Sequence, residues 1–154
     1  MAIFSRLMFE LVDAAARKGL AGSSGETRRD KARATGIRGE TYAYWYLRRH
    51  GYVFVARNYT APGIKGEIDL VGYDGRVLAF VEVKTRSAAD DSRAEAEEAV
   101  TADKRRILSR MARRFLAERR LAEADCRFDV LAIECREGRR PEVRLHKGAF
   151  NAGG

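Results

Sequence analysis

The chain has 154 residues, enough for one domain with its own core and too few for two. It carries 30 Lys and Arg against 22 Asp and Glu, and the formal net charge of +8 favours a polyanionic partner. No apolar run approaches the ~20 residues that span a bilayer. The two cysteines, Cys126 and Cys135, have neither the spacing nor the neighbours of a zinc site. We therefore expect a cytoplasmic protein with reduced thiols and no membrane partner.

The first segment, residues 3–18, has the spacing of an amphipathic helix. Glu10 and Asp13 interrupt the apolar core that a secretory signal peptide needs. We expect the helix to pack on the domain or on a protein partner. Membrane-surface binding is less favoured, because the polar face carries acids as well as bases. The apolar stripe consists of Ile3, Phe4, Leu7, Met8, Leu11, Val12 and Ala15.

A linker is predicted next, because residues 19–25 contain three glycines and two serines and a charged run continues to Arg33. The chain then divides into a helix plus linker over residues 1–35, a main domain over residues 36–150 and a tail over residues 151–154. A second helix is predicted over residues 35–50 with Thr35 as its cap. Its buried stripe consists of Ala43, Tyr46, Leu47 and His50.

Glu40 falls on the buried stripe of this second helix, three residues before Ala43 and seven before Leu47. Its carboxylate therefore points inward, where a surface acid would point out. A glutamate near a helix N-terminus is also favoured by the helix dipole, and this alternative has equal weight. A strand over residues 52–59 and a turn-rich connection over residues 61–66 follow.

Residues 66–86, GEIDLVGYDGRVLAFVEVKTR, predict a β-hairpin with Asp74-Gly75 as its loop. With this loop, Asp69 lies opposite Phe80 and Glu67 opposite Glu82. Side chains alternate along a strand, so Glu82 and Lys84 share one face about 7 Å apart, with Asp69 diagonal to Glu82. The opposite face of the second strand is apolar and requires a covering layer. That face consists of Val77, Ala79, Val81 and Val83.

The ordinary interpretation of the charges on this hairpin is a solvated edge strand. However, the acidic side chains of Glu67, Asp69 and Glu82 repel one another and need a compensating cation. Lys84 supplies one positive charge and Arg86 a second, and a divalent metal ion would supply more.

After a polar loop over residues 87–98, the longest helix is predicted from Thr101 to about Leu121. Eight basic and two acidic residues between 101 and 122 give it a local net charge of +6. Its core stripe consists of Leu108, Met111, Ala112 and Phe115. On the opposite side, phosphate contact and simple solvation are equally favoured for Arg106, Arg110, Arg113 and Arg114. Lys104 and Arg105 flank the stripe and could reach the hairpin face.

Strands over residues 127–135 and 142–146 follow, with Asp129 as a structural partner of a nearby Arg or Lys.

Two sequence strings, residues 66–70 (GEIDL) and 80–86 (FVEVKTR), resemble the YraN family of bacterial proteins. The resemblance covers residues 36–150 and includes Arg38-Gly39-Glu40, Asn58, Lys104, residues 127–130 and the ending 146–150. The family is similar in fold to archaeal Holliday-junction resolvases, which belong to the PD-(D/E)XK nuclease superfamily. The resemblance therefore implies an α/β, restriction-endonuclease-like core, with a mixed central sheet and an antiparallel hairpin flanked by helices.

The same resemblance implies a Mg²⁺- or Mn²⁺-dependent endonuclease acting on DNA, including branched or otherwise structured DNA, with RNA not excluded. Asp69, Glu82 and Glu40 would hold the metal, and Lys84 would orient the attacking water or stabilise charge on the phosphate. Glu67 would support these ligands or pair with an arginine. The candidate nucleic-acid contacts are Arg86, Lys104, Arg105, Arg106, Arg110 and Arg113.

Two other functions stay open from the sequence. The chain could be a nucleic-acid-binding module that keeps the fold without cutting, its carboxylates serving only as a charge network. It could also be a scaffold that recruits proteins through its N-terminal helix. A homodimer is compatible with each of these functions.

Overall fold

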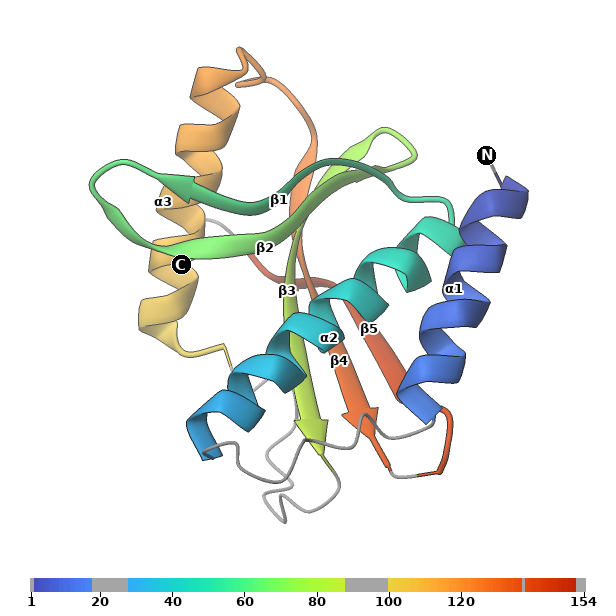
Figure 1. Cartoon of the computed structure of the whole chain (residues 1–154). Coiled ribbons are helices and arrows are strands. Elements are labelled where there is room, and N and C mark those ends of the chain that lie inside the picture. The colour runs from blue at the N-terminus through green and yellow to red at the C-terminus, as the bar shows by residue number, and fades with distance from the viewer. Residues whose placement is uncertain (1, 18–27, 88–99, 137, 152–154) are drawn as a thin grey trace.

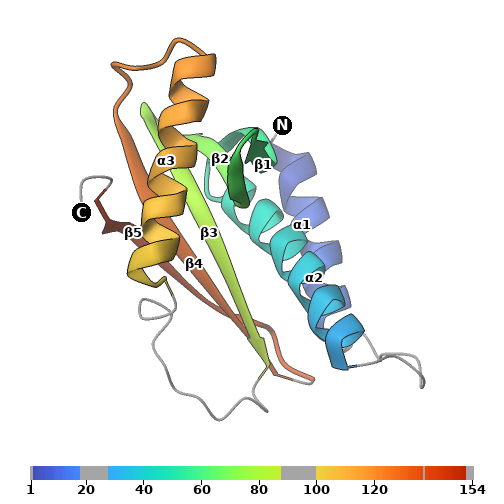
Figure 2. The ribbon, with the colours of Figure 1, turned by 90° about the vertical axis from the view of Figure 1, so that its left-hand side faces the viewer.

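The structure, a computed structural model, describes residues 2–17, 28–87, 100–136 and 138–151. The elements are α1 (Ala2–Arg17), α2 (Arg28–Arg49), β1 (Val53–Ala61), β2 (Ile64–Asp74), β3 (Val77–Ser87), α3 (Ala102–Glu118), β4 (Cys126–Cys135) and β5 (Glu142–Phe150). The strands form one sheet in the order β1-β2-β3-β4-β5. The helices α1 and α2 cover one face of this sheet and α3 covers the other (Figure 1, Figure 2). The expected α/β class is confirmed.

The sheet is mixed, as the family resemblance implied. Strands β1, β2 and β3 form an antiparallel meander. Strand β4 pairs in parallel with β3, and α3 lies in the crossover connection that a parallel pair requires. Strand β5 returns antiparallel to β4.

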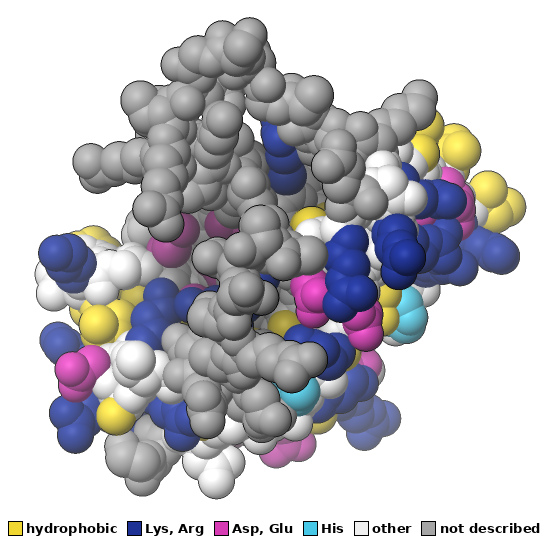
Figure 3. Space-filling view, turned by 90° about the horizontal axis from the view of Figure 1, so that it is seen from below, with side chains coloured by type: hydrophobic (Ala, Val, Ile, Leu, Met, Phe, Trp, Pro, Cys, Tyr) yellow, Lys and Arg dark blue, Asp and Glu magenta, His cyan; other side chains and the backbone are white. Residues whose placement is uncertain are grey.

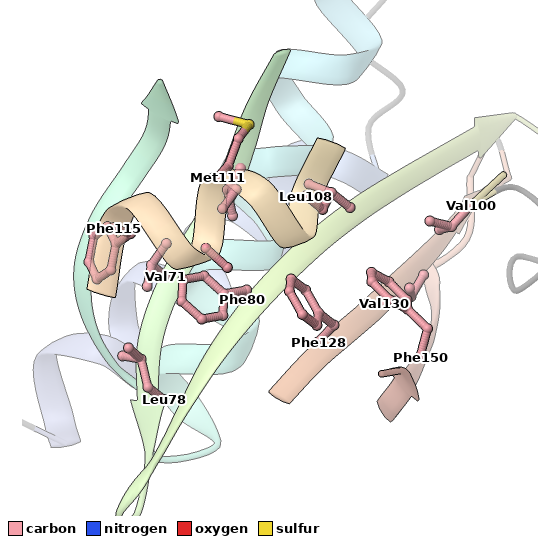
Figure 4. Close-up of a cluster of buried hydrophobic side chains, with 12 residues drawn as sticks. Val71, Leu78, Phe80, Val100, Leu108, Met111, Phe115, Phe128, Val130 and Phe150 are labelled. Atoms are coloured by element: carbon pink, nitrogen blue, oxygen red, sulfur yellow. The ribbon is translucent and has the colours of Figure 1, made fainter. Parts of the chain in front are cut away.

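Each face of the sheet has its own apolar core. On the α3 side, Leu108, Met111 and Phe115 pack against Phe80 and Phe128 (Figure 4). On the α2 side, the buried residues include Ala43, Leu47, Ala79, Val81 and Leu131. The predicted covering layer over the apolar face of β3 is therefore α2, and the predicted core stripe of α3 is confirmed. The expectation that α3 is the longest helix was wrong, because α3 has 17 residues and α2 has 22.

The hairpin forms, but its register differs from the prediction by two residues. The pairs run from Leu70–Val81 to Asp74–Val77, so Gly75 and Arg76 form the turn. A shift of two residues keeps every side chain on its predicted face, because side chains alternate with a period of two. The register was wrong and the faces were right.

Several predicted boundaries also move. Helix α2 begins at Arg28, so the charged run before Arg33 is helical and Thr35 lies inside the helix rather than capping it. Arg, Lys and Ala are good helix formers, which accounts for the earlier start. Strand β2 begins at Ile64, and β5 continues to Phe150. The predicted linker over residues 19–25 and the polar loop after Ser87 lie outside the described residues.

Helix α1 packs on α2, but not through the stripe that the sequence predicted. Its buried residues are Ser5, Phe9 and Asp13, and Ile3 and Leu7 are exposed. The Asp13 carboxylate is fully buried and accepts a hydrogen bond from the Tyr42 hydroxyl at 2.9 Å, which fixes this face inward. None of the helices within the ranges given above is long and apolar enough to cross a membrane.

Candidate metal centre

The candidate centre lies where β2 and β3 separate. Their paired residues end at Leu70–Val81. Beyond this pair β3 continues beside β4, whereas β2 stays with β1 and runs away from β3 (Figure 1). Asp69 is the first residue of β2 past the last pair, and its Oδ2 accepts a hydrogen bond from the Val83 backbone N–H at 2.7 Å. The Asp69 carboxylate thus accepts the hydrogen bond that a backbone carbonyl of a paired strand would otherwise accept. This bond fixes the carboxylate between β2 and β3.

Helix α2 brings Glu40 to the same place because Gly39 allows a close approach to β3. A Cβ atom at Gly39 would lie 1.8 Å from Thr85 Oγ1 and 2.8 Å from Thr85 Cβ, so any other residue here would force α2 or Thr85 to move. Glu40 follows directly and is half-buried. Its position was predicted from the helical stripe, and the contact between Gly39 and Thr85 is the packing that sets it.

The backbone conformation of Gly66 places the next residue, Glu67, at the centre. The backbone of Gly66 has a φ of 122°, a region that favours glycine, and an added Cβ would lie 3.3 Å from Ile107 Cγ2 on α3. Carboxylate oxygens of Glu40, Glu67 and Asp69 then lie within 4.8 Å of one another. Three anionic oxygens at this spacing could hold a metal ion.

Burial of this acidic group disfavours the charged carboxylates. Desolvation, followed by the charge of Glu82, raises the pKa of Asp69 to about 7, against a hydrogen bond from Val83 that lowers it. Burial is also the largest cause that raises the pKa of Glu40, with the charges of Glu67 and Glu82 adding to it. A cation at this point would relieve the repulsion.

Glu82 is close to the group without being part of the 4.8 Å triad. Its side chain is only 6% exposed, and its Oε1 lies 3.2 Å from Lys84 Nζ and 3.4 Å from Lys104 Nζ. Its Oε2 is buried and has no hydrogen-bond partner among the described residues. A buried carboxylate oxygen without a partner is costly, so this atom is available to a ligand.

The structure therefore brings some of the predicted site residues together and leaves others apart. Glu40 and Asp69 come together, Lys84 pairs with Glu82, and Lys104 reaches the hairpin face as expected. Arg105 does not reach it, because its Nε donates to the Val100 carbonyl at 3.0 Å and its guanidinium lies over the Phe150 ring. Glu67, expected as a supporting residue, is one of the three converging carboxylates.

The basic residues farther from the centre are also placed. Arg86 is half-buried farther along β3. Arg110 and Arg113 are exposed on α3, and Arg106 is exposed and pairs with Asp103 at 3.3 Å.

Asn58 is a contributor to the centre that the sequence reasoning left without a role. Its side chain hydrogen-bonds Glu40 and lowers the pKa of that carboxyl, with Arg57 acting in the same direction through its charge. Its φ of 48° is unusual for a residue with a Cβ, although Asn tolerates this region better than most residues. Asn58 is among the residues that resemble the YraN family. Its role could not be predicted, because hydrophobic periodicity does not reveal a residue with left-handed backbone inside a strand.

Asp129 serves a separate, structural network, as predicted. It is fully buried and binds Arg127 Nε at 2.8 Å and the Gly148 N–H at 3.0 Å. Arg127 also pairs with Asp74, which Lys147 binds at 2.7 Å. This network joins the hairpin turn to β4 and β5.

Comparison with known proteins gives a consistent family. The model of the uncharacterised protein family UPF0102 matches residues 39–133. A UPF0102 protein of Koribacter versatilis is 45% identical over 117 residues, covering 75% of this chain and 78% of the relative. One from Symbiobacterium thermophilum is 42% identical over 121 residues, covering 79% and 99%. One from Geobacter metallireducens is 39% identical over 118 residues, covering 77% and 93%. The chain therefore belongs to the UPF0102 family, the YraN-like family that its motifs indicated.

Proposed function

We propose that the chain is a metal-dependent endonuclease with a restriction-endonuclease-like core. The observation that carries this proposal is the convergence of Glu40, Glu67 and Asp69 within 4.8 Å beside the buried, unpartnered Oε2 of Glu82. Hard divalent cations such as Mg²⁺ and Mn²⁺ take all-oxygen ligand sets of this kind. The donors present fit such an ion, both in chemistry and in their excess of negative charge.

Glu40, Glu67 and Asp69 would hold the ion, with Glu82 Oε2 available as a further ligand. A bound divalent ion neutralises phosphate charge and lowers the pKa of a bound water. The protein's own contribution is positioning: the Val83 N–H holds Asp69, and Glu82 Oε1 holds the Lys84 ammonium at 3.2 Å. From there Lys84 would donate to the charge that develops on the phosphate.

Cleavage is favoured over simple binding by the charge at the centre. The centre contains four carboxylates, those of Glu40, Glu67, Asp69 and Glu82. Two ammonium groups, those of Lys84 and Lys104, lie close to it, and both pair with Glu82. A phosphodiester is an anion and would be repelled from this group unless a cation neutralises it. A module that only binds nucleic acid gains nothing from buried acids, whereas a metal-dependent hydrolase needs them.

The test is a cleavage screen with the full chain on duplex, forked, flapped and four-way DNA and on RNA, in Mg²⁺, Mn²⁺ or EDTA. We expect metal-dependent cutting of at least one substrate. Metal-independent binding without cutting on every substrate would assign the chain to the non-cleaving alternative.

Helix α3 should add affinity through phosphate contacts. Replacing Arg106, Arg110 and Arg113 by Glu should weaken binding on every sequence and flatten its salt dependence, because fewer counterions are released. Arg76→Glu, exposed in the β2–β3 turn, makes the same exchange at one site away from α3 and is compared with each single α3 variant. Filter binding across a salt series measures both slopes. An unchanged slope in the triple variant would make these arginines ordinary solvated residues.

Asn58 should matter for metal affinity through its amide and not through its backbone. Asn58→Gly keeps the left-handed conformation at little strain but removes the hydrogen bond to Glu40. We expect Mn²⁺ to bind this variant about tenfold more weakly, on the scale of a lost support to a metal ligand. Calorimetric titration measures the affinity, and thermal unfolding without metal checks that the fold is intact. Equal affinities in wild type and variant would contradict this role.

A further inference from the structure

Helix α1 exposes a continuous apolar face. The side chains of Ile3, Phe4, Leu7 and Leu11 are 85%, 57%, 58% and 57% exposed. Residues three and four apart share one side of a helix, so these four form a single stripe. The opposite side of α1 is the one that packs on the domain. Exposed apolar surface of this extent is unusual on a monomer and marks a binding surface.

The stripe is held on a rigid support. Asp13 is fully buried and binds Tyr42, Arg17 and Arg140 at 2.9, 2.7 and 3.0 Å. Phe9 packs on the Tyr42 ring with centroids 5.4 Å apart. Turning the helix to bury its leucines would break this network. The buried contacts of Asp13 and Phe9 therefore hold the apolar stripe on the solvent-exposed side of α1.

The apolar surface continues from α1 onto α2. The Phe4 and Trp45 rings pack edge to face with centroids 5.9 Å apart, and the Trp45 and Tyr44 centroids are 5.0 Å apart. We call Ile3, Phe4, Leu7, Leu11 and Trp45 the α1 patch. Two other large hydrophobic residues in the described ranges are exposed to a similar degree, Val53 and Val55 on β1.

Within the described part of the chain, the surroundings of the α1 patch carry four arginines against two acids, Asp13 and Glu10, and these acids pair with three of the arginines, which leaves a net positive charge. Figure 3 shows hydrophobic side chains at the upper right, next to several Lys and Arg side chains with acidic side chains among them. Arg6 and Arg17 are exposed on α1, Arg49 lies over the Phe9 ring, and Arg140 approaches from the connection between β4 and β5. The exposed acid here is Glu10, which Arg49 and Arg140 approach to 3.6 and 3.9 Å.

This charge decides between the occupants. In a two-fold dimer the same patch meets itself, which would bring the arginines of both copies together. Nucleic acid could use the arginines and the aromatic rings, but it would leave the exposed aliphatic side chains of Ile3, Leu7 and Leu11 without an apolar partner. An anionic lipid surface offers acyl chains for the stripe and headgroups for the arginines. We propose that the α1 patch docks on an anionic lipid bilayer, with α1 lying parallel to the membrane plane.

The single tryptophan of the chain makes the test direct, because Trp45 belongs to the patch. The full chain is titrated with vesicles of phosphatidylglycerol and phosphatidylcholine in equal parts, and with vesicles of phosphatidylcholine alone. We expect a blue shift of the Trp45 emission and co-sedimentation with the anionic vesicles, weakened by salt. Pure phosphatidylcholine should bind about tenfold less, because it lacks the headgroup attraction.

The variant Leu7→Gln/Leu11→Gln changes exposed positions and should fold normally, which circular dichroism checks. Its partition into anionic vesicles should fall about tenfold or more. The matched control is Val53→Gln/Val55→Gln, which removes exposed apolar side chains from β1 and should bind like wild type.

Absence of vesicle binding by the wild type, or equal binding by the leucine variant, would overturn the proposal. Concentration-dependent dimerisation that the leucine variant abolishes, without vesicle binding, would assign the patch to a second copy. Cross-linking of α1 to an acidic protein without vesicle binding would assign it to a protein groove. Either result overturns lipid docking, and none depends on whether the chain cleaves nucleic acid.

Discussion

Asp69→Asn should make the protein more stable than wild type at about pH 8, by up to about 4 kcal/mol. Burial, with the charge of Glu82 as the second cause, raises the pKa of Asp69 from 3.8 to about 7. Between these pH values the folded chain holds a proton that the unfolded chain has released, so the free energy of unfolding falls as pH rises. Above the folded pKa the whole loss is present, and an uncharged Asn avoids it.

Urea denaturation at about pH 5 and about pH 8 measures this difference. At the lower pH the folded chain keeps the Asp69 proton that most of the unfolded chain has already released, so the variant should exceed wild type by only about 2 kcal/mol, and the gap should widen towards pH 8. Asp125→Asn, exposed in the connection between α3 and β4, is the matched control and should follow wild type throughout. An unchanged pH dependence in Asp69→Asn would locate the destabilising charge on another group.

The same experiment with metal ties stability to function. Mg²⁺ or Mn²⁺ should raise the urea midpoint of wild type at about pH 8, because a ligand that binds only the folded chain stabilises it. Asp69→Asn, having lost one of the three converging carboxylates, should respond much less. In this prediction the centre destabilises the fold without an ion and stabilises it when the ion is bound.

The faces of the hairpin could be predicted from sequence because the side-chain period of a strand is two. Val81 and Ala79 turned to α2 and Phe80 to α3, as alternation requires. The register could not be fixed, because a two-residue loop at Asp74-Gly75 and one at Gly75-Arg76 place the same side chains on the same faces. The register does change the position of Asp69 along β2 relative to Glu82 on β3. This position decides how close the two carboxylates lie.

The acidic group needed tertiary information in a different way. Alternation gave Asp69 and Glu82, and the helical stripe gave Glu40. Glu67 joins them because β2 leaves β3 after Leu70, a divergence that no local pattern encodes. Burial of Asp13 likewise reversed the expected orientation of α1, since hydrophobic periodicity assigns the apolar stripe to the core and cannot see a buried carboxylate network.

Lys84 best separates an enzyme from a binding module. It shares Glu82 Oε1 with Lys104, so Lys84→Ala leaves the buried carboxylate with one ammonium partner at 3.4 Å. The fold and the acidic group should therefore persist, and metal and nucleic acid should still bind. Cleavage should fall by a factor of about 100 or more, on the scale of removing one donor to the transition state.

Single-turnover cleavage, with Mn²⁺ titration on the same samples, tests this separation. Lys84→Arg should rescue little, because a planar fork does not replace a compact ammonium. Lys147→Ala is the matched control, since Lys147 pairs with Asp74 in the structural network and should leave cleavage near wild type. If Lys84→Ala cuts as fast as wild type, the cutting does not come from this centre, and a contaminating nuclease is the first explanation to examine. If it loses metal binding as well, Lys84 acts by holding Glu82 in place and not on the phosphate.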